Sequence, residues 1–129
     1  MIPESHKDLL KSKALAHVAT IGPDGRPESN PVWFGWDGEH VLFSTTTGRQ
    51  KYQNLKRNPD VALSIVDPRN PYRYLEVRGK VERFDPDPNK AFIDSMAQKY
   101  LGQAKYTGDG SGAERVVVVI APEHTTSMG

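Results

Sequence analysis

The chain contains no cysteine, which excludes disulfides, thiolate metal sites and cysteine nucleophiles. Such a composition suits a reducing compartment, so we expect a cytoplasmic protein. No apolar run approaches the ~20 residues that are needed to cross a bilayer. Residues 1–7 also lack the basic and apolar segments of a signal peptide, and we expect no membrane partner.

Neither sign of charge is in excess, because 17 Lys and Arg oppose 16 Asp and Glu for a net charge of +1. No overall field therefore favours nucleic acid as a partner. The four histidines show no ligand spacing, so we expect no metal site. A P-loop and a GxSxG elbow are also missing, and the carboxylates fall mainly in turns. A chain with no evident nucleophile or acid–base pair suits chemistry that is carried by a cofactor.

The 129 residues suit a single domain over 1–129. Alternating apolar residues and turn signals predict six strands and two or three short helices, with no regular alternation of strand and helix. We expect a mainly β, α+β fold, a six-stranded antiparallel barrel with helices at its openings. The predicted strands are 14–21, 28–36, 40–46, 60–66, 72–84 and 115–121, and the predicted helices are 6–13, a short one ending near residue 58, and 89–100.

Further expectations attach to single positions and to the two glycine-rich or terminal segments. Ser5 is expected to cap the first helix. Gly79, inside a predicted strand, indicates a bend or the close approach of another group. Residues 102–112 contain four glycines and predict a lid or a linker, and residues 122–129 a tail. The third helix is expected to bury Phe92, Ile93, Met96 and Leu101.

A proline interrupts the second predicted strand at Asn30-Pro31. Proline cannot donate to a ladder, so this position predicts an edge, a bulge or an opening in the sheet. Beyond it, Val32, Phe34 and Trp36 share one face, while Trp33 shares the other with Gly35.

The stretch Ser44–Leu55 passes from a predicted strand, through hydroxyls and a glycine, into a predicted helix. A helix start presents free N–H groups and the positive end of its dipole, and Arg49 and Lys51 add two cations there. One interpretation is a phosphate-binding cradle. The other is a solvated first turn that Thr47 caps, although cations in a first turn oppose the helix dipole.

Motifs along most of the chain, from about residue 5 to residue 122, carry a resemblance to a known family. They are Ala16–Pro27, Asn30–Phe34, Ser44–Thr46 with Arg49, Lys51, Asn54 and Leu55, then Asn58-Pro59, Tyr72–Tyr74 and Val77–Gly79. With these residues the chain resembles the pyridoxamine 5'-phosphate-oxidase-like flavin and deazaflavin oxidoreductases, which form split β-barrels. It is most similar to their short branch that uses coenzyme F420.

The resemblance implies a six-stranded split barrel of the FMN-binding type, and a homodimer with two cofactor sites at its interface. Arg49 and Lys51 match the family's phosphate-binding residues, with Ser44, Thr45 and Gln50 beside them. One further segment matches the strand that lies along the flavin ring: Asn30, Pro31, Val32 and Trp33. Another matches a stretch that approaches the cofactor, on the same subunit or from the partner: Pro71, Tyr72, Arg73 and Tyr74.

The resemblance leaves the flavin open. The family's pyridoxamine-phosphate oxidases continue into a basic C-terminal segment, whereas this chain ends soon after Ile120. Gln50 separates Arg49 from Lys51, whereas the FMN enzymes tend to have adjacent Arg and Lys. We therefore expect an enzyme that transfers a hydride from reduced F420 to a conjugated small-molecule acceptor. The alternatives are an FMN-dependent oxidoreductase and a non-catalytic flavin, deazaflavin or haem-related binding protein.

Overall fold

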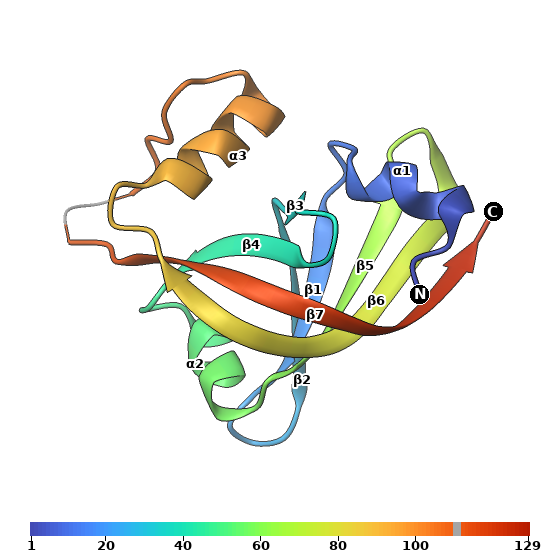
Figure 1. Cartoon of the computed structure of the whole chain (residues 1–129). Helices are drawn as coiled ribbons and strands as arrows, with labels where there is room; N and C mark the ends of the chain where they lie inside the picture. The colour runs from blue at the N-terminus through green and yellow to red at the C-terminus, as the bar shows by residue number, and fades with distance from the viewer. Residues whose placement is uncertain (110–111) are drawn as a thin grey trace.

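The computed structural model describes residues 1–109 and 112–129, and within them the chain forms one antiparallel sheet with three α-helices (Figure 1). A 3-10 turn, Glu4–His6, leads into the first helix. The helices are α1 (Lys7–Leu10), α2 (Gln50–Arg57) and α3 (Ala91–Leu101). The seven strands of this part of the chain are β1 (Ala16–Ile21), β2 (Pro27–Val32), β3 (Gly35–Trp36), β4 (Val41–Thr46), β5 (Asp60–Asp67), β6 (Asn70–Pro86) and β7 (Arg115–Met128).

The two edges of the sheet are neighbours in the sequence. The strand order β2-β1-β5-β6-β7-β4-β3 places β2 and β3 at opposite edges, yet only Trp33 and Phe34 separate them. Val32 and Gly35 can be at most ~10 Å apart along so short a link. The sheet must therefore curl until its edges nearly meet, without a ladder to close it.

This split explains why the prediction of six strands is wrong. The predicted strand 28–36 is two strands, β2 and β3, with a break at Trp33 and Phe34. The predicted faces are confirmed, because Phe34 is fully buried and Val32 and Trp36 pack against the core. Pro31 lies on β2, an edge strand, where its missing N–H disturbs no ladder.

The core fills the inside of the curled sheet. On β4, β5 and the middle of β6, alternate residues are buried and their neighbours are less so, as the period of two predicts, whereas residues 115–120 of β7 are buried on both faces. Its members include Phe43 on β4, Leu63 and Ile65 on β5, and Leu75 and Val77 on β6. Leu9 and Leu10 of α1 close one end of this core.

Gly79 confirms the expected close approach. A Cβ at this position would stand 2.1 Å from the carbonyl oxygen of Ala121 on β7, so a side chain is excluded. The register of β6 and β7 shifts between Arg78 and Gly79, which marks a bulge.

Residues 122–128 of the predicted tail 122–129 are strand. They continue β7 to Met128 and pair with β6, while the pairing of β7 with β4 ends at Ile120. Beyond Ile120 the strand therefore has one described ladder partner. Pro122 is tolerated there because an edge strand can dispense with one N–H.

The helices begin and end differently from the predictions. The first is shorter than residues 6–13, and Ser5 bonds the ring of His6 at 2.7 Å instead of capping a helix. Leu101 is 54% exposed, and the inward stripe of α3 is Ile93, Met96 and Ala97. Asp87 caps this helix by accepting hydrogen bonds from the N–H groups of residues 92 and 93. None of the described helices is long and apolar enough to span a membrane.

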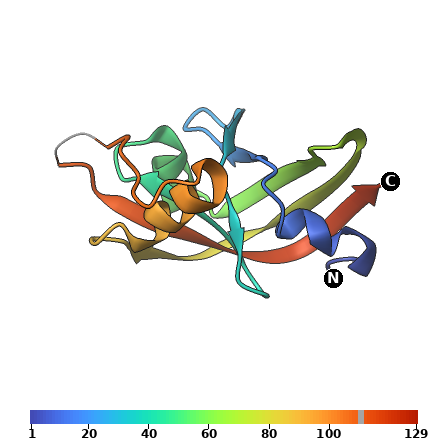
Figure 2. The ribbon, with the colours of Figure 1, turned by 90° about the horizontal axis from the view of Figure 1, so that it is seen from above.

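The predicted loop 102–112 lies partly outside the described residues, because 110 and 111 are not among them. Viewed from above, α3 and the segment that follows it lie over the end of the sheet where β4 and α2 also meet (Figure 2). This arrangement brings α3 onto the split between β2 and β3.

Candidate functional site

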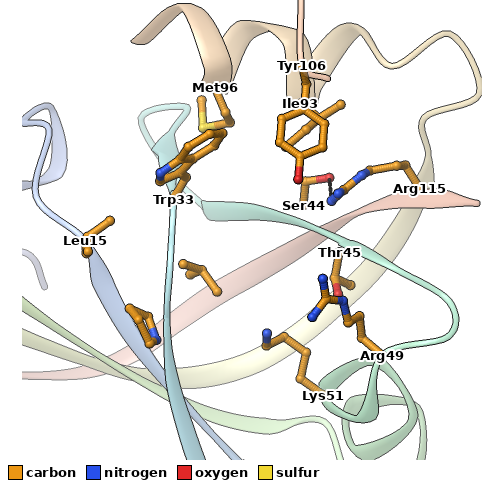
Figure 3. A pocket seen from close by; sticks show the side chains of 12 residues that line it. Leu15, Trp33, Ser44, Thr45, Arg49, Lys51, Ile93, Met96, Tyr106 and Arg115 are labelled. Carbon is orange, nitrogen blue, oxygen red and sulfur yellow. Dashed lines mark hydrogen bonds between the residues drawn. The ribbon is translucent and has the colours of Figure 1, made fainter. Parts of the chain in front are cut away.

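A pocket of about 380 Å³ lies where the split of the sheet, the end of β4, the start of α2 and the inner face of α3 converge (Figure 3). Its volume falls within the usual range for small-molecule sites. One end is basic and hydroxylic, and the other is apolar and aromatic. The lining residues are Leu15, Pro31, Val32, Trp33, Ser44, Thr45, Arg49, Lys51, Ile93, Met96, Tyr106 and Arg115.

The basic end holds two cations that the described residues do not neutralise. Arg49 and Lys51 both point from the start of α2 into the pocket (Figure 3). Neither makes an ion pair with any described carboxylate, and no acidic side chain lines the pocket. Burial lowers the pKa of the half-buried Lys51 ammonium, and the positive charge of Arg49 lowers it further. Both effects favour the binding of an anion beside Arg49 and Lys51.

The backbone adds to this preference. Helix α2 begins at Gln50, so Arg49 occupies the N-cap position and Thr47 does not, contrary to one of the two interpretations above. No side chain caps the helix, and its first turn contains no acidic residue. The free N–H groups and dipole of an uncapped helix start attract an anion to the place where the two cations meet.

A buried asparagine holds this helix in position. Asn54 is fully buried, and its amide donates to the Thr20 hydroxyl at 2.9 Å and to Glu28 at 3.0 Å. Its oxygen accepts a 2.8 Å hydrogen bond from Gln50. Because Thr20 and Glu28 belong to β1 and β2, these bonds fix the first turn of α2 against the sheet.

The apolar end is built around Trp33. Its ring stacks on that of Tyr100, with centroids 5.4 Å apart and planes 8° apart. The edge of a second ring, Tyr106, meets it at 5.9 Å and 86°. Met96 and Ile93 of α3 complete this side of the pocket (Figure 3). Such a wall suits a flat, apolar ligand group.

Arg115 is a third cation of the pocket, but it is already neutralised. Its guanidinium binds the Asp109 carboxylate with the closest contact at 2.7 Å, and both side chains are more than nine-tenths buried. Nη1 also donates to Ser44 at 3.3 Å, and the guanidinium lies 4.9 Å from the centroid of the Tyr106 ring. The hydrogen bonds from Arg115 lower the pKa of the Asp109 carboxyl. Arg115 therefore fixes the pocket wall.

Seven of the residues predicted for a cofactor site lie together in this pocket: Pro31, Val32, Trp33, Ser44, Thr45, Arg49 and Lys51. Asn30 is exposed on β2 next to the pocket, and Gln50 is engaged with Asn54. The segment Pro71–Tyr74 lies elsewhere on the chain, at the hairpin that joins β5 to β6. There Arg73 binds Asp8 and Asp67.

Sequence reasoning missed the pocket residues Leu15, Ile93, Met96, Tyr106 and Arg115 as site residues. A helical period carried from Ile93 through Met96 reaches Tyr100, and that spacing could have found the inner face of α3. Nothing local in the sequence marks Tyr106 or Arg115, because their placement depends on how the segment after α3 folds back. Among the described residues, no group of His, Asp and Glu side chains is arranged to hold a metal ion.

Comparisons with known proteins identify the family and the fold. A family model described as pyridoxamine 5'-phosphate oxidase matches residues 2–129. A solved structure named F420 reductase is 46% identical, with a TM-score of 0.89 over 97% of this chain and 98% of that one. Rv2991, a conserved hypothetical protein from Mycobacterium tuberculosis, is 27% identical, with a TM-score of 0.77 over 98% of this chain and 84% of its own. A putative pyridoxamine 5'-phosphate oxidase from Listeria innocua shares the fold at 19% identity, with a TM-score of 0.74 over 97% and 96%.

Proposed function

This chain belongs to the pyridoxamine 5'-phosphate oxidase family, and on that premise we propose that it is an oxidoreductase whose pocket binds coenzyme F420. The structure that is 46% identical over nearly the full length is named an F420 reductase, which supports this choice of cofactor. The acceptor that we propose is a conjugated small molecule.

The single observation that carries the proposal is the pairing of two free cations with an aromatic wall in one pocket. Arg49 and Lys51 would hold the cofactor phosphate, with the Ser44 and Thr45 hydroxyls beside them. Trp33 and the neighbouring backbone of Pro31 and Val32 would lie along the ring. The residues present therefore fit a flat cofactor that carries a phosphate at one end.

The division of labour follows from the pocket lining. A bound deazaflavin supplies the hydride, and the protein supplies binding, orientation and a dry surrounding. Arg49 and Lys51 would anchor one end of the cofactor and would thereby orient its ring against Trp33. Ile93 and Met96 present apolar surface that excludes water from the ring end.

FMN is the second candidate, because it also joins a phosphate to a flat ring and the family is described by a flavin enzyme. The separation of Arg49 from Lys51 by Gln50 favours F420. A non-catalytic binding protein would share the same pocket and would differ only in the absence of turnover.

Titration of the purified protein with F420 and with FMN, followed by cofactor fluorescence, tests the proposal. We expect F420 to bind more tightly than FMN and Lys51→Met to weaken F420 binding. Lys56→Met is the matched control, since Lys56 is a cation on the same helix that lies over Tyr52 and outside this pocket. F420 binding equal in both variants and wild type would overturn the assignment of the phosphate end. Binding without reduction of any quinone, enone or tetrapyrrole would favour the non-catalytic alternative.

We further propose a homodimer in which Pro71–Tyr74 of one copy approaches the cofactor of the other. Tyr72 is 76% exposed in the single chain, as a residue reserved for a partner would be. Sedimentation analysis tests the dimer. Tyr72→Ala should weaken association or F420 binding, whereas an unaffected dimer with unaffected binding would remove this segment from the site.

A further inference from the structure

The break between β2 and β3 leaves backbone groups that the sheet does not pair. Phe34 lies within the break, and its side chain is fully buried. A buried N–H or C=O without a hydrogen bond would cost about 1–3 kcal/mol. Some other part of the chain must therefore satisfy the backbone of Phe34.

Helix α3 provides both partners, from more than sixty residues away in the sequence. The hydroxyl of Tyr100 accepts a 3.2 Å hydrogen bond from the Phe34 N–H. The ammonium of Lys99 donates a 2.7 Å hydrogen bond to the Phe34 carbonyl. Two consecutive side chains of one helix thus replace the missing ladder at the split.

The Tyr100 hydroxyl also reaches the other wall of the pocket. It donates a 2.7 Å hydrogen bond to the carbonyl of Ala14, the residue before the pocket-lining Leu15. One hydroxyl therefore joins the chain just before β1 to the chain just after β2. Both neighbours, Leu15 and Trp33, line the pocket, so this hydroxyl helps to set their separation.

Lys99 is held in a setting that suits this role. Its ammonium lies 4.7 Å from the centroid of the Phe34 ring and 4.9 Å from that of Tyr100. No described carboxylate pairs with it, and burial lowers its pKa. A cation that is half buried between two rings and a carbonyl is costly to maintain, which points to a positional task.

We propose that Lys99 and Tyr100 are positioning residues, which hold Trp33 as a fixed wall of the pocket by bonding the backbone at the split. The stacking of the Trp33 ring on Tyr100 orients the same residue from its side-chain end. Close packing of α3 over Gly35, where a Cβ would stand 3.4 Å from Met96, keeps the helix seated. The inference rests on the proposed function only for the ligand that Trp33 would face.

Tyr100→Phe tests the proposal, because it keeps the stacked ring and removes the hydroxyl. With Trp36→Phe as the background, Trp33 is the only tryptophan, and acrylamide quenching reports how firmly it is covered. We expect Tyr100→Phe to raise the quenching constant of Trp33 and to weaken F420 binding about fivefold, the equivalent of one typical hydrogen bond. Lys99→Met should act in the same direction, and Lys99→Arg should restore most of the loss.

Ser12→Ala is the matched control. The Ser12 hydroxyl likewise bridges two backbone groups, Leu9 O at 2.8 Å and Ala14 N at 3.1 Å, without contacting Trp33. We expect it to lower the melting temperature and to leave the quenching of Trp33 unchanged. A purely structural role would make Tyr100→Phe behave in the same way, and that result would overturn the proposal.

Two further outcomes keep the test decisive. If Tyr100→Phe does not fold, Lys99→Met and Lys99→Arg give the same comparison, and equal quenching in both would overturn the proposal. If the wild type binds neither F420 nor FMN, the proposed function fails, while the quenching of Trp33 still decides the role of Lys99 and Tyr100.

Discussion

Two groups of cationic side chains, one around Arg73 and one at Arg49 and Lys51, differ in whether carboxylates pair with them. At the hairpin between β5 and β6, Arg73 binds Asp8 at 2.7 Å and Asp67 at 3.0 Å, and it also donates to the Ser5 carbonyl. At the start of α2, Arg49 and its neighbour Lys51 have no described carboxylate within ion-pair distance. The first cluster ties the N-terminal segment to the sheet.

The comparison separates cations that stabilise the fold through carboxylates from cations that are available to bind a ligand. A guanidinium such as that of Arg73, whose two terminal nitrogens are both engaged, stabilises the fold and has little left for binding. Two cations that repel one another, at an uncapped helix start, reduce stability until an anion arrives. Charge alone does not identify a site, but at Arg49 and Lys51 the unpaired charge coincides with an uncapped helix start and a pocket. Arg115 stands between the two cases, because it lines the pocket and is nevertheless fully paired.

The largest effect is expected from Arg115→Met. Removal of the guanidinium leaves the buried Asp109 carboxylate with only its longer contact to Lys90, at 3.4 Å, and breaking such a buried pair costs about 3 kcal/mol. Urea denaturation measures the loss. The double variant Arg115→Met/Asp109→Asn should recover part of it, because no uncompensated charge then remains. A fully stable Arg115→Met would place Arg115 with the free cations instead.

Lys51→Met should separate binding from stability. We expect the affinity for F420 to fall by about 1.5–3 kcal/mol, the range for a charge-assisted hydrogen bond. The free energy of unfolding should stay the same or rise, because the variant removes a half-buried cation that Arg49 repels. Fluorescence titration and urea denaturation measure the two quantities. A loss of stability equal to that of Arg115→Met would show that Lys51 has a structural partner.

A smaller effect is expected when the pH is raised on the wild type. Since burial and Arg49 lower the pKa of Lys51 in the free protein and a bound phosphate would raise it, binding takes up a proton. Affinity for F420 should therefore fall as the pH rises through the pKa of Lys51 in the free protein. This pKa lies below the ordinary value of lysine. Lys51→Arg keeps its charge and should remove this decline. A decline that persists in Lys51→Arg would assign the titration to another group.

The sequence predicts the local features of the fold well, and the reasons are local. The hairpin corners, the close approach at Gly79 and the inward faces of the strands depend on residue type and on a period of two. The pattern from Val32 to Trp36 alternates without interruption, however, so the break at Trp33 is invisible in it. At that break Tyr100 and Lys99 bond the Phe34 backbone from a helix that is distant in the sequence, so the partners that satisfy it cannot be read locally.

The candidate site divides in the same way. The placement of Arg49 and Lys51 at one helix start was predictable, because a strand that ends in hydroxyls and turns into a helix brings them together within a few residues. Tyr106 and Arg115 were not, because tertiary contacts place them: Arg115 pairs with Asp109, and the Tyr106 ring packs against Trp33 and Arg115. Local chemistry thus predicts the basic end of the pocket, and tertiary contacts complete its aromatic end.

The smallest effect is expected from Arg73→Gln, which removes the paired cation of the comparison. The pair of Arg73 with Asp8 is solvent-accessible on its Asp8 side and the pair with Asp67 is partly covered, so the melting temperature should fall modestly, and less at high salt. Its hydrogen bond lowers the pKa of Asp8, whereas a backbone N–H lowers that of Asp67 first and Arg73 second. The wild type should therefore lose stability as the pH falls through these lowered values, and Arg73→Gln should lose less.

Arg49→Gln is the matched control. Because Arg49 has no described carboxylate partner, its loss should leave both the melting temperature and the loss of stability at low pH unchanged. Equal behaviour of the two variants would erase the distinction between paired and free cations on which the phosphate site rests.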